Sequence, residues 1–194
     1  MEHPMSDPHN PARYGEVWPQ YKIDAYLQAM QPLKNLVVLS GGWAWHFLSP
    51  QGHTEFKHAH DHKDLDIMVP RRTVSSTMVA LRDAGFQKVP TKYDRLPSEE
   101  DFRRYEKVIT LEHQQGMVAT LEGFRLTIDF FVKDVPVLQT PSGWLVVRPD
   151  VLLSYYSTIH SSKSCWAVVA AQKLLAEGTA PEALVGDQRL MEVP

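Results

Sequence analysis

The chain has 194 residues, which is enough for one compact domain with a hydrophobic core. The net charge is −3 with histidine neutral, and no basic block is present, which argues against a large non-specific nucleic-acid footprint. Cys165 is the only cysteine, so an internal disulfide is excluded and a reducing compartment, the cytoplasm, is expected. The first residues do not have the pattern of a secretory signal, and no apolar run is long enough to cross a bilayer.

The composition changes along the chain and indicates three parts. Residues 1–19 are rich in Pro, Asn, Asp and His and predict a flexible N-terminal arm. Residues 20–148 alternate apolar strand patterns with helical ones and predict the core domain. Residues 149–194 predict a C-terminal helical part packed on the same domain.

Hydrophobic periodicity predicts the individual elements. Helices are expected over 21–30, 43–48 and 73–84, from Pro149 onward, and from Ser161 to Gly178, with a further helix start at residues 98–101. Strands are expected over 36–39, 64–69, 86–89, 105–111, 117–121, 124–132 and 144–147, with Gly123 breaking the pattern. In the helix over 73–84, Thr73 is expected to cap the N-terminus, and Val74, Met78 and Leu81 are expected to face the core. The order predicts an α/β fold, or α+β by a strict count: a mixed, twisted sheet flanked by helices, with C-terminal helices.

The residues Ser40, Gly41 and Gly42 stand between the strand over 36–39 and the helix over 43–48. Two glycines allow a sharp turn and a close approach of a ligand to the main chain. Free N–H groups at the start of a helix attract anions. The segment therefore predicts an anion site, with Ser40, Gly41 and Gly42 as candidate phosphate-binding residues.

Three acids lie in apolar strands. Asp64 and Asp66 are two positions apart in the strand over 64–69, so both project from one face. Asp129 lies inside the strand over 124–132, where a buried carboxylate needs a partner or a metal ion. Like charges that are close together repel, and a divalent cation relieves the repulsion. An anion site beside paired carboxylates is what a nucleoside triphosphate with Mg²⁺ requires.

Four histidines, His53, His58, His60 and His62, lie in or beside the segment before Asp64. One interpretation is a zinc or nickel site. The other is a polar loop at the rim of the site, with His62 orienting the neighbouring carboxylates. The spacing His58-Ala59-His60-Asp61-His62 is one residue too short for the His-x-His-x-Asp-His pattern of metallo-β-lactamases, so the polar loop is the favoured interpretation.

Together these motifs resemble the nucleotidyltransferase superfamily related to DNA polymerase β. The segments Gly41-Gly42-Trp43-Ala44 and His62-Lys63-Asp64-Leu65-Asp66 are similar to the two signatures of small lincosamide and aminoglycoside nucleotidyltransferases, and Asp129 stands for the third acid. The resemblance covers roughly residues 36–132. It departs at His46, where those enzymes often carry an acid, and at Lys163-Ser164, where they carry a Lys-Asp pair.

The resemblance implies a specific chemistry. Asp64, Asp66 and Asp129 would be the catalytic residues and the ligands of two Mg²⁺ ions, and Ser40, Gly41 and Gly42 would hold the triphosphate. Lys163 is a candidate phosphate contact at a helix start, and a solvated lysine is the alternative. The nucleotide would pass from a nucleoside triphosphate to a small hydroxylated, antibiotic-like acceptor. A tRNA or protein acceptor, a catalytically silent nucleotide-binding or antitoxin-like module, and a histidine-based metallohydrolase are the other hypotheses.

The substitution Asp129→Asn is expected to keep nucleotide binding and to abolish transfer. It is also expected to stabilise the metal-free protein, because one contribution to like-charge repulsion disappears.

Overall fold

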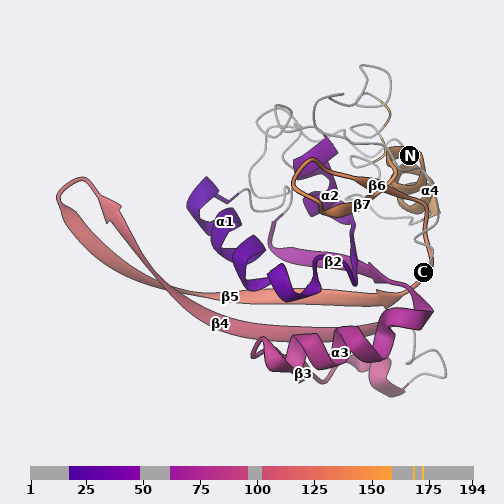
Figure 1. Cartoon of the computed structure of the whole chain (residues 1–194), viewed down its shortest axis with the longest axis horizontal. Coiled ribbons are helices and arrows are strands. Elements are labelled where there is room, and N and C mark those ends of the chain that lie inside the picture. The colour runs from indigo at the N-terminus through magenta and orange to yellow at the C-terminus, as the bar shows by residue number, and fades with distance from the viewer. Residues whose placement is uncertain (1–17, 49–61, 96–101, 159–167, 169–171, 173–194) are drawn as a thin grey trace, which may run out of the picture.

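The computed structural model describes residues 18–48, 62–95, 102–158, 168 and 172 (Figure 1). Its helices are α1 (Gln20–Ala29), α2 (Gly41–Leu48), α3 (Val74–Asp83) and α4 (Pro149–Thr158), with short 3-10 turns η1 (Gln31–Leu33), η3 (Arg71–Thr73) and η4 (Lys92–Arg95). Its strands are β1 (Val38–Leu39), β2 (Asp64–Val69), β3 (Gln87–Val89), β4 (Phe102–Gln115), β5 (Val118–Val132), β6 (Val137–Gln139) and β7 (Leu145–Val147).

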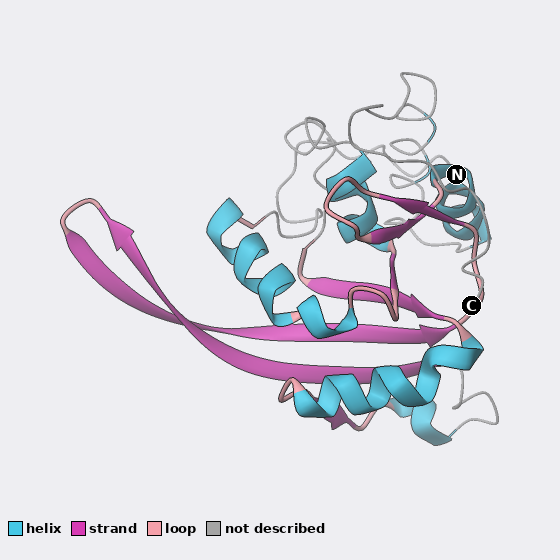
Figure 2. Cartoon of the chain, viewed as in Figure 1, coloured by secondary structure: helices cyan, strands magenta, loops and turns pink. Residues whose placement is uncertain are grey.

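The seven strands form one mixed, twisted sheet in the order β3-β4-β5-β2-β1-β7-β6. Two strand pairs are parallel, β2 with β5 and β1 with β7, and the other four pairs are antiparallel. Helices pack against this sheet, as Figure 2 shows by secondary structure. The predicted α/β class, with a mixed twisted sheet flanked by helices, is therefore confirmed.

The strands β4 and β5 form a long ribbon that extends beyond the rest of the sheet (Figure 1). They are paired along their whole length and joined by a tight turn at Gly116, whose φ of +68° suits a residue without a Cβ. The outer part of the ribbon is solvated: Val108, Val118 and Leu121 are all more than 60% exposed. The inner part of β5 is central to the sheet and pairs with β2.

The inner part of β5 carries a different kind of residue on each face. Leu126, Ile128 and Phe130 share one face and are completely buried. This is the face that the helices cover, because Lys22 of α1 lies over the ring of Phe124, and Lys107 donates a hydrogen bond to the carbonyl of Ala84 after α3. The other face of β5 carries Arg125, Thr127 and Asp129.

Several details of the described helices and strands differ from the predicted ones. Gly123 does not interrupt β5, since it pairs with Thr110 and has open space where a Cβ would lie. Met78 was expected in the core and is 37% exposed, whereas Thr77 of the same helix is buried. Thr73 does not cap α3 with its side chain; its hydroxyl donates to main-chain carbonyls before the helix. Strand β6 falls in a stretch expected to be a loop.

Other predictions fall outside the described residues. These are the arm before Trp18, the histidines at 53, 58 and 60, the helix start at residues 98–101, and the helix expected after Ser161, apart from isolated helical positions at 168 and 172. Within the described part of the chain, no helix is long and apolar enough to cross a bilayer.

Candidate functional site

The three predicted acids lie on one face of two neighbouring strands. The parallel register of β2 and β5 places Asp66 directly opposite Asp129, and Asp64 opposite Thr127. Residues that are opposite in register point to the same side of a sheet, and Asp64 lies two positions from Asp66. All three acids therefore project from the face that does not carry Leu126 and Ile128. The expected position of Asp129 on the same face as the pair is confirmed.

The glycine turn lies beside Asp66. The amide of Ser40 donates a hydrogen bond of 2.8 Å to the carbonyl of Asp66, which continues the pairing of β1 with β2. Gly41 follows with φ +57°, a left-handed conformation, and begins α2. A Cβ on Gly41 would overlap Asp66 Oδ2 and lie 3.3 Å from its Cγ. Glycine is therefore required here twice, by its backbone angle and by the carboxylate beside it.

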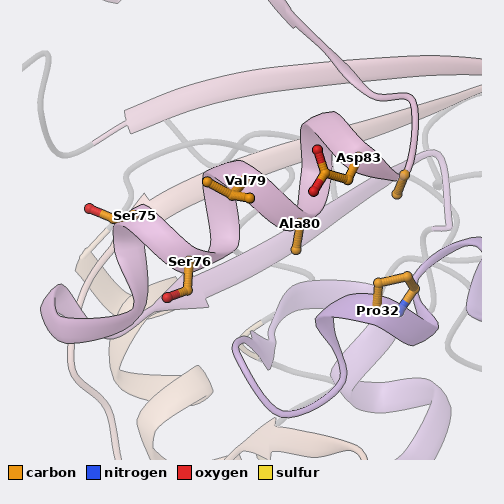
Figure 3. Close-up of a pocket in the computed structure, with 7 residues that line it drawn as sticks. Pro32, Ser75, Ser76, Val79, Ala80 and Asp83 are labelled. Carbon is orange, nitrogen blue, oxygen red and sulfur yellow. The ribbon is translucent and has the colours of Figure 1, made fainter.

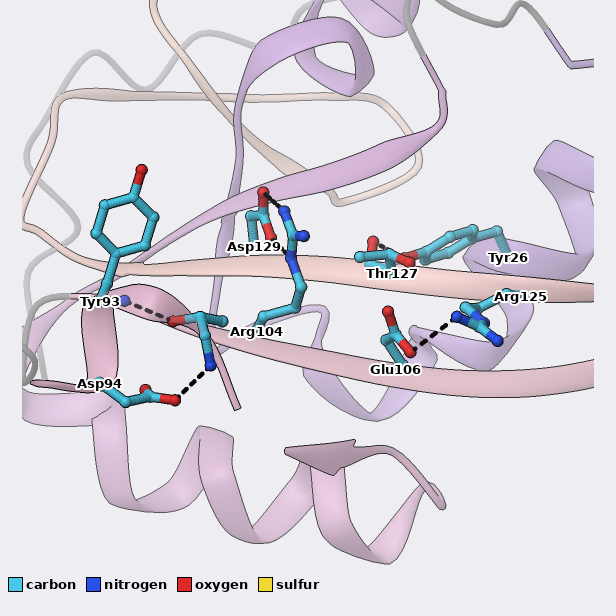
Figure 4. A network of polar contacts seen from close by, with 9 residues as sticks. Tyr26, Tyr93, Asp94, Arg104, Glu106, Arg125, Thr127 and Asp129 are labelled. Carbon is cyan, nitrogen blue, oxygen red and sulfur yellow. Dashed lines mark hydrogen bonds and ion pairs between the residues drawn. The ribbon is translucent and has the colours of Figure 1, made fainter. Parts of the chain in front are cut away.

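On the other side of Asp129, strand β4 supplies an arginine. Arg104 is opposite Asp129 in the antiparallel register of β4 and β5. Its Nε lies 2.7 Å from Asp129 Oδ1 and its Nη2 lies 2.8 Å from Oδ2, so the ion pair is bidentate (Figure 4). The Asp129 side chain is 13% exposed and that of Arg104 is 36% exposed. Asp66, Asp129 and Arg104 thus lie in one row across the sheet, with Gly41 of α2 against the carboxylate of Asp66. We call these four residues the charged row.

The charges of the row act on each other. Hydrogen bonding to Asp129 is the largest cause that raises the pKa of Arg104, and burial of the guanidinium opposes it. The negative charges of Asp129, Asp64 and Glu106 also raise this pKa. Arg104 therefore stays protonated and neutralises part of the negative charge on this face.

Tyr26 of α1 lies behind the acids and is completely buried. Its hydroxyl donates a hydrogen bond of 2.8 Å to the carbonyl of Thr127 (Figure 4). Burial raises the pKa of Tyr26 well above its ordinary value, and the negative charges of Asp64, Asp129 and Asp66 raise it further. The negative charges of all three acids therefore act on this one phenol.

The donor set can be compared with the needs of a metal ion. Carboxylate oxygens suit Mg²⁺, which protein sites usually hold through one or two carboxylates together with substrate phosphates and water. Asp64 and Asp66 supply such a pair. Among residues 18–48, 62–95 and 102–158, no three His, Cys, Asp or Glu side chains are grouped closely enough to hold an ion by themselves. The pair has the oxygen chemistry that Mg²⁺ prefers, while Asp129 is engaged by Arg104.

His62 lies in an aromatic cluster and is 1% exposed. Its Nδ1 accepts a hydrogen bond of 3.2 Å from the amide of Trp18, and its carbonyl accepts one of 3.3 Å from the indole of Trp43. The imidazole also packs edge-on against the rings of Trp43 and His46. These contacts fix the chain just before Asp64, which is a structural role.

The remaining predicted residues have different positions. Ser40 is 3% exposed and belongs to the buried junction of β1 and α2, and its carbonyl accepts a hydrogen bond from the amide of Ala44. Gly42 is the second residue of α2. Lys163 lies outside the described residues, so its phosphate contact stays a prediction.

Sequence reasoning did not find Arg104 or Tyr26. Arg104 was assigned to no site because the strand was predicted to begin at Tyr105, so that Arg104 fell one residue before it. An earlier strand start would have placed it near Asp129, but the register of β4 against β5 is fixed by the turn at Gly116, far along the ribbon. Tyr26 lies in the helix predicted over 21–30, and a helical pattern carries no information about the carbonyl that its hydroxyl reaches.

A separate hollow of about 610 Å³ lies between η1 and α3 (Figure 3). It is lined by Pro32, Ser75, Ser76, Val79, Ala80, Asp83 and Ala84. None of these residues belongs to the charged row. Asp83, the charged residue of the lining, forms an exposed ion pair with its neighbour Arg82 at 3.0 Å. The polar side chains of the hollow are this single carboxylate and the hydroxyls of Ser75 and Ser76, so it lacks the paired carboxylates of the charged row.

Comparisons with known proteins give little further information. No protein-family model matches the chain, and no curated protein matches it. Among solved structures, the Megavirus polyadenylate synthase is similar with a TM-score of 0.44 and 12% sequence identity. The similarity covers 96% of this chain and 43% of the synthase, so the chain spans less than half the length of that protein.

Proposed function

We propose that the chain is a Mg²⁺-dependent nucleotidyltransferase, which moves a nucleoside monophosphate from a triphosphate to a hydroxyl group and releases pyrophosphate. The observation that carries the proposal is the pairing of Asp66 with Asp129 in parallel strands, with Asp64 on the same face and Gly41 against the Asp66 carboxylate. The motif resemblance of residues 40–44 and 62–66 supports the same activity. The proposed compartment is the cytoplasm, from the single cysteine.

The residues of the chain would divide the work in a simple way. Asp64 and Asp66 would hold Mg²⁺ together with the triphosphate, and Asp129 would complete a second ion site or accept the proton of the attacking hydroxyl. Bound there, Mg²⁺ would stabilise charge on the attacking and leaving oxygens of an in-line displacement. Ser40, Gly41 and Gly42, at the start of α2, would contact the β and γ phosphates. Positioning and charge would supply most of the catalysis.

The proposed acceptor is a small hydroxylated compound of the antibiotic kind. It is favoured over tRNA by the slightly negative net charge and the absence of a basic block in the sequence. A protein acceptor is a further alternative within the same reaction class.

A second candidate function is a nucleotide-binding module without catalysis. The bidentate ion pair between Arg104 and Asp129 favours it, since it occupies both oxygens of the third acid. This module would still bind a triphosphate through Asp64, Asp66 and the glycine turn. It differs from the transferase in one measurable respect, which is the absence of any transfer.

The two candidates are separated by a labelling experiment. The full chain is incubated with Mg²⁺ and each α-³²P-labelled nucleoside triphosphate, with separate pools of small hydroxylated antibiotics, tRNA and proteins. We expect label in the small-molecule pool and equimolar pyrophosphate, both lost in the double variant Asp64→Asn/Asp66→Asn. Triphosphate binding without transfer to any pool would establish the silent module. Absence of triphosphate binding would overturn both candidates.

A further inference from the structure

Arg104 contacts both carboxylate oxygens of Asp129, which are the atoms that would bind a metal ion at this acid. Both guanidinium-to-carboxylate distances, 2.7 and 2.8 Å, are those of strong charge-assisted hydrogen bonds. The pair lies in the inner part of the ribbon, where β4 and β5 are in continuous register. Asp129 can therefore turn toward Asp66 only by giving up contacts to Arg104.

The electrostatics of the face make this exchange a competition between cations. Asp64, Asp66 and Asp129 bring three negative charges to two adjacent strands, and Arg104 supplies the compensating positive charge next to Asp129. A divalent cation between Asp66 and Asp129 would supply the same compensation from the opposite side. Two cations that neutralise the same carboxylate bind with negative coupling, because each reduces the attraction available to the other.

A second arginine of the same face provides a comparison. Arg125 lies on β5, four positions before Asp129, and pairs with Glu106 of β4 at 3.5 Å (Figure 4). Its side chain is 65% exposed, and its contact is long and single. Arg125 thus has the same charge, the same sheet face and no contact with the three acids. What distinguishes Arg104 is the short bidentate contact to a candidate metal ligand.

We propose that Arg104 is a positioning residue that competes with a divalent cation for Asp129. Without the cation Arg104 keeps the Asp129 carboxylate in its ion pair, and cation binding releases this carboxylate. The inference rests on the proposed function, because it assigns Asp129 to the metal site. Release of Asp129 also frees the guanidinium, whose planar set of five N–H donors suits a phosphate or another anion in the same site.

The test measures cation binding without any nucleotide or acceptor. Mn²⁺ is titrated into the metal-free full chain, and free Mn²⁺ is followed by electron paramagnetic resonance. We expect Arg104→Met to bind Mn²⁺ on the order of tenfold more tightly than the wild-type chain, since the competing charge is removed. The matched variant Arg125→Met should keep the wild-type affinity. Adding Asp129→Asn to Arg104→Met should abolish the gain, because the released ligand is then missing.

A second variant covers the case in which Arg104→Met does not fold. Arg104→Lys keeps the positive charge and loses the bidentate fork, so a smaller gain in Mn²⁺ affinity is expected. Wild-type or weaker affinity in the folded Arg104 variants would overturn the inference, and so would an equal gain in Arg125→Met. A gain that persists in the double variant with Asp129→Asn would also overturn it.

Failure of this inference is distinguishable from failure of the proposed function. If label transfer occurs and the Arg104 variants bind Mn²⁺ as the wild type does, the competition is wrong and the transferase stands. If no transfer occurs and Arg104→Met binds Mn²⁺ more tightly through Asp129, the competition stands in a silent module. If neither wild type nor Arg104→Met binds Mn²⁺, the inference is overturned.

Discussion

Asp129 carries two opposing roles at the scale of single residues. In the structure its carboxylate is the partner of Arg104, and in the proposed reaction it would be a metal ligand or a base. The contact with Arg104 changes the effect on stability that is expected when Asp129 is neutralised. Considered without Arg104, Asp129→Asn relieves repulsion with Asp64 and Asp66 and should stabilise the protein. With Arg104 in bidentate contact, the same substitution removes a short ion pair.

We therefore expect Asp129→Asn to lower the free energy of unfolding of the metal-free protein by about 1–2 kcal/mol, between the values for exposed and for buried pairs. Relief of the repulsion with Asp64 and Asp66 offsets part of the stability that is lost with the ion pair to Arg104. The measurement is urea unfolding in EDTA. Glu106→Gln is the matched control, because Glu106 meets Arg125 at 3.5 Å and should change stability by less than about 0.5 kcal/mol. Equal stability of Asp129→Asn and wild type would show that repulsion cancels the pair.

Gly41 allows a second test at this scale. Gly41→Ala places a Cβ on a left-handed backbone, which costs about 1–2 kcal/mol, and also pushes the new Cβ into the Asp66 carboxylate. Gly116→Ala is the control for the backbone cost alone, since Gly116 has φ +68° and nothing within 4 Å of its missing Cβ. We expect Gly41→Ala to lose more stability than Gly116→Ala in thermal unfolding, and to lose triphosphate binding. Equal losses would contradict the steric role of Gly41.

The acids and the glycine turn could be found from the sequence because each follows a local rule. Alternation over two positions places Asp64 and Asp66 on one face, and glycines between a strand and a helix mark a close approach. Arg104 could not be found, because its contact with Asp129 depends on the register of a hairpin whose turn at Gly116 is twelve residues beyond it. The tie from Tyr26 to Thr127 depends in addition on how α1 lies over the sheet.

At the scale of elements, Tyr26 fixes α1 to the main chain of β5. The pKa of Tyr26 is raised in the folded state, so the folded protein keeps this proton at a pH where the unfolded chain loses it. The stability contributed by the protonated phenol is therefore complete below a pH of about 10, and it is lost as the pH rises toward the folded pKa.

We expect Tyr26→Phe to cost about 1 kcal/mol of stability at pH 7, because one buried hydrogen bond is lost. The difference in stability between the variant and the wild type should shrink above a pH of about 10. There the wild-type protein loses stability because folding keeps Tyr26 protonated, and the Phe variant has no such loss. Urea unfolding between pH 7 and 11 measures both quantities. Tyr93→Phe is the control, because the Tyr93 side chain belongs to the exposed turn η4. A constant difference across this range would refute the linkage.

Strand prediction was complete where alternation is strong, and it left gaps at residues 112–115 and 122–123 of the ribbon, where solvent weakens the alternation. The inner part of β5 alternates clearly, since one face is buried and the other carries polar residues. Toward the turn both faces are largely solvated, so the sequence no longer alternates and Gly123 suggests an interruption. Pairing with β4 maintains the strand there without burial. Hydrogen bonds between two chain segments leave no periodic signal in either one.

For the whole molecule, distant parts of the sequence meet in the centre of the sheet. β1 lies between β2 and β7, so Leu39 is opposite Ile67 on one side and Val146 on the other. A single hydrophobic core spans the helices and the inner strands. The fold class was predictable from the order of the elements along the chain. The order of the strands in the sheet was not, because parallel neighbours such as β1 and β7 are selected by packing after the whole chain is present.

The order of the strands also bears on how the protein acquires its site during synthesis. The ribbon of β4 and β5 joins neighbours in sequence through a tight turn, and we expect it to close early. β2 is made long before β5, and Asp66 can pair with β5 only after Asp129 has emerged. Arg104, in contrast, meets Asp129 within the ribbon itself. The arginine can therefore neutralise this acid before the other two carboxylates arrive, so that assembly of the sheet never has to bring three bare negative charges together.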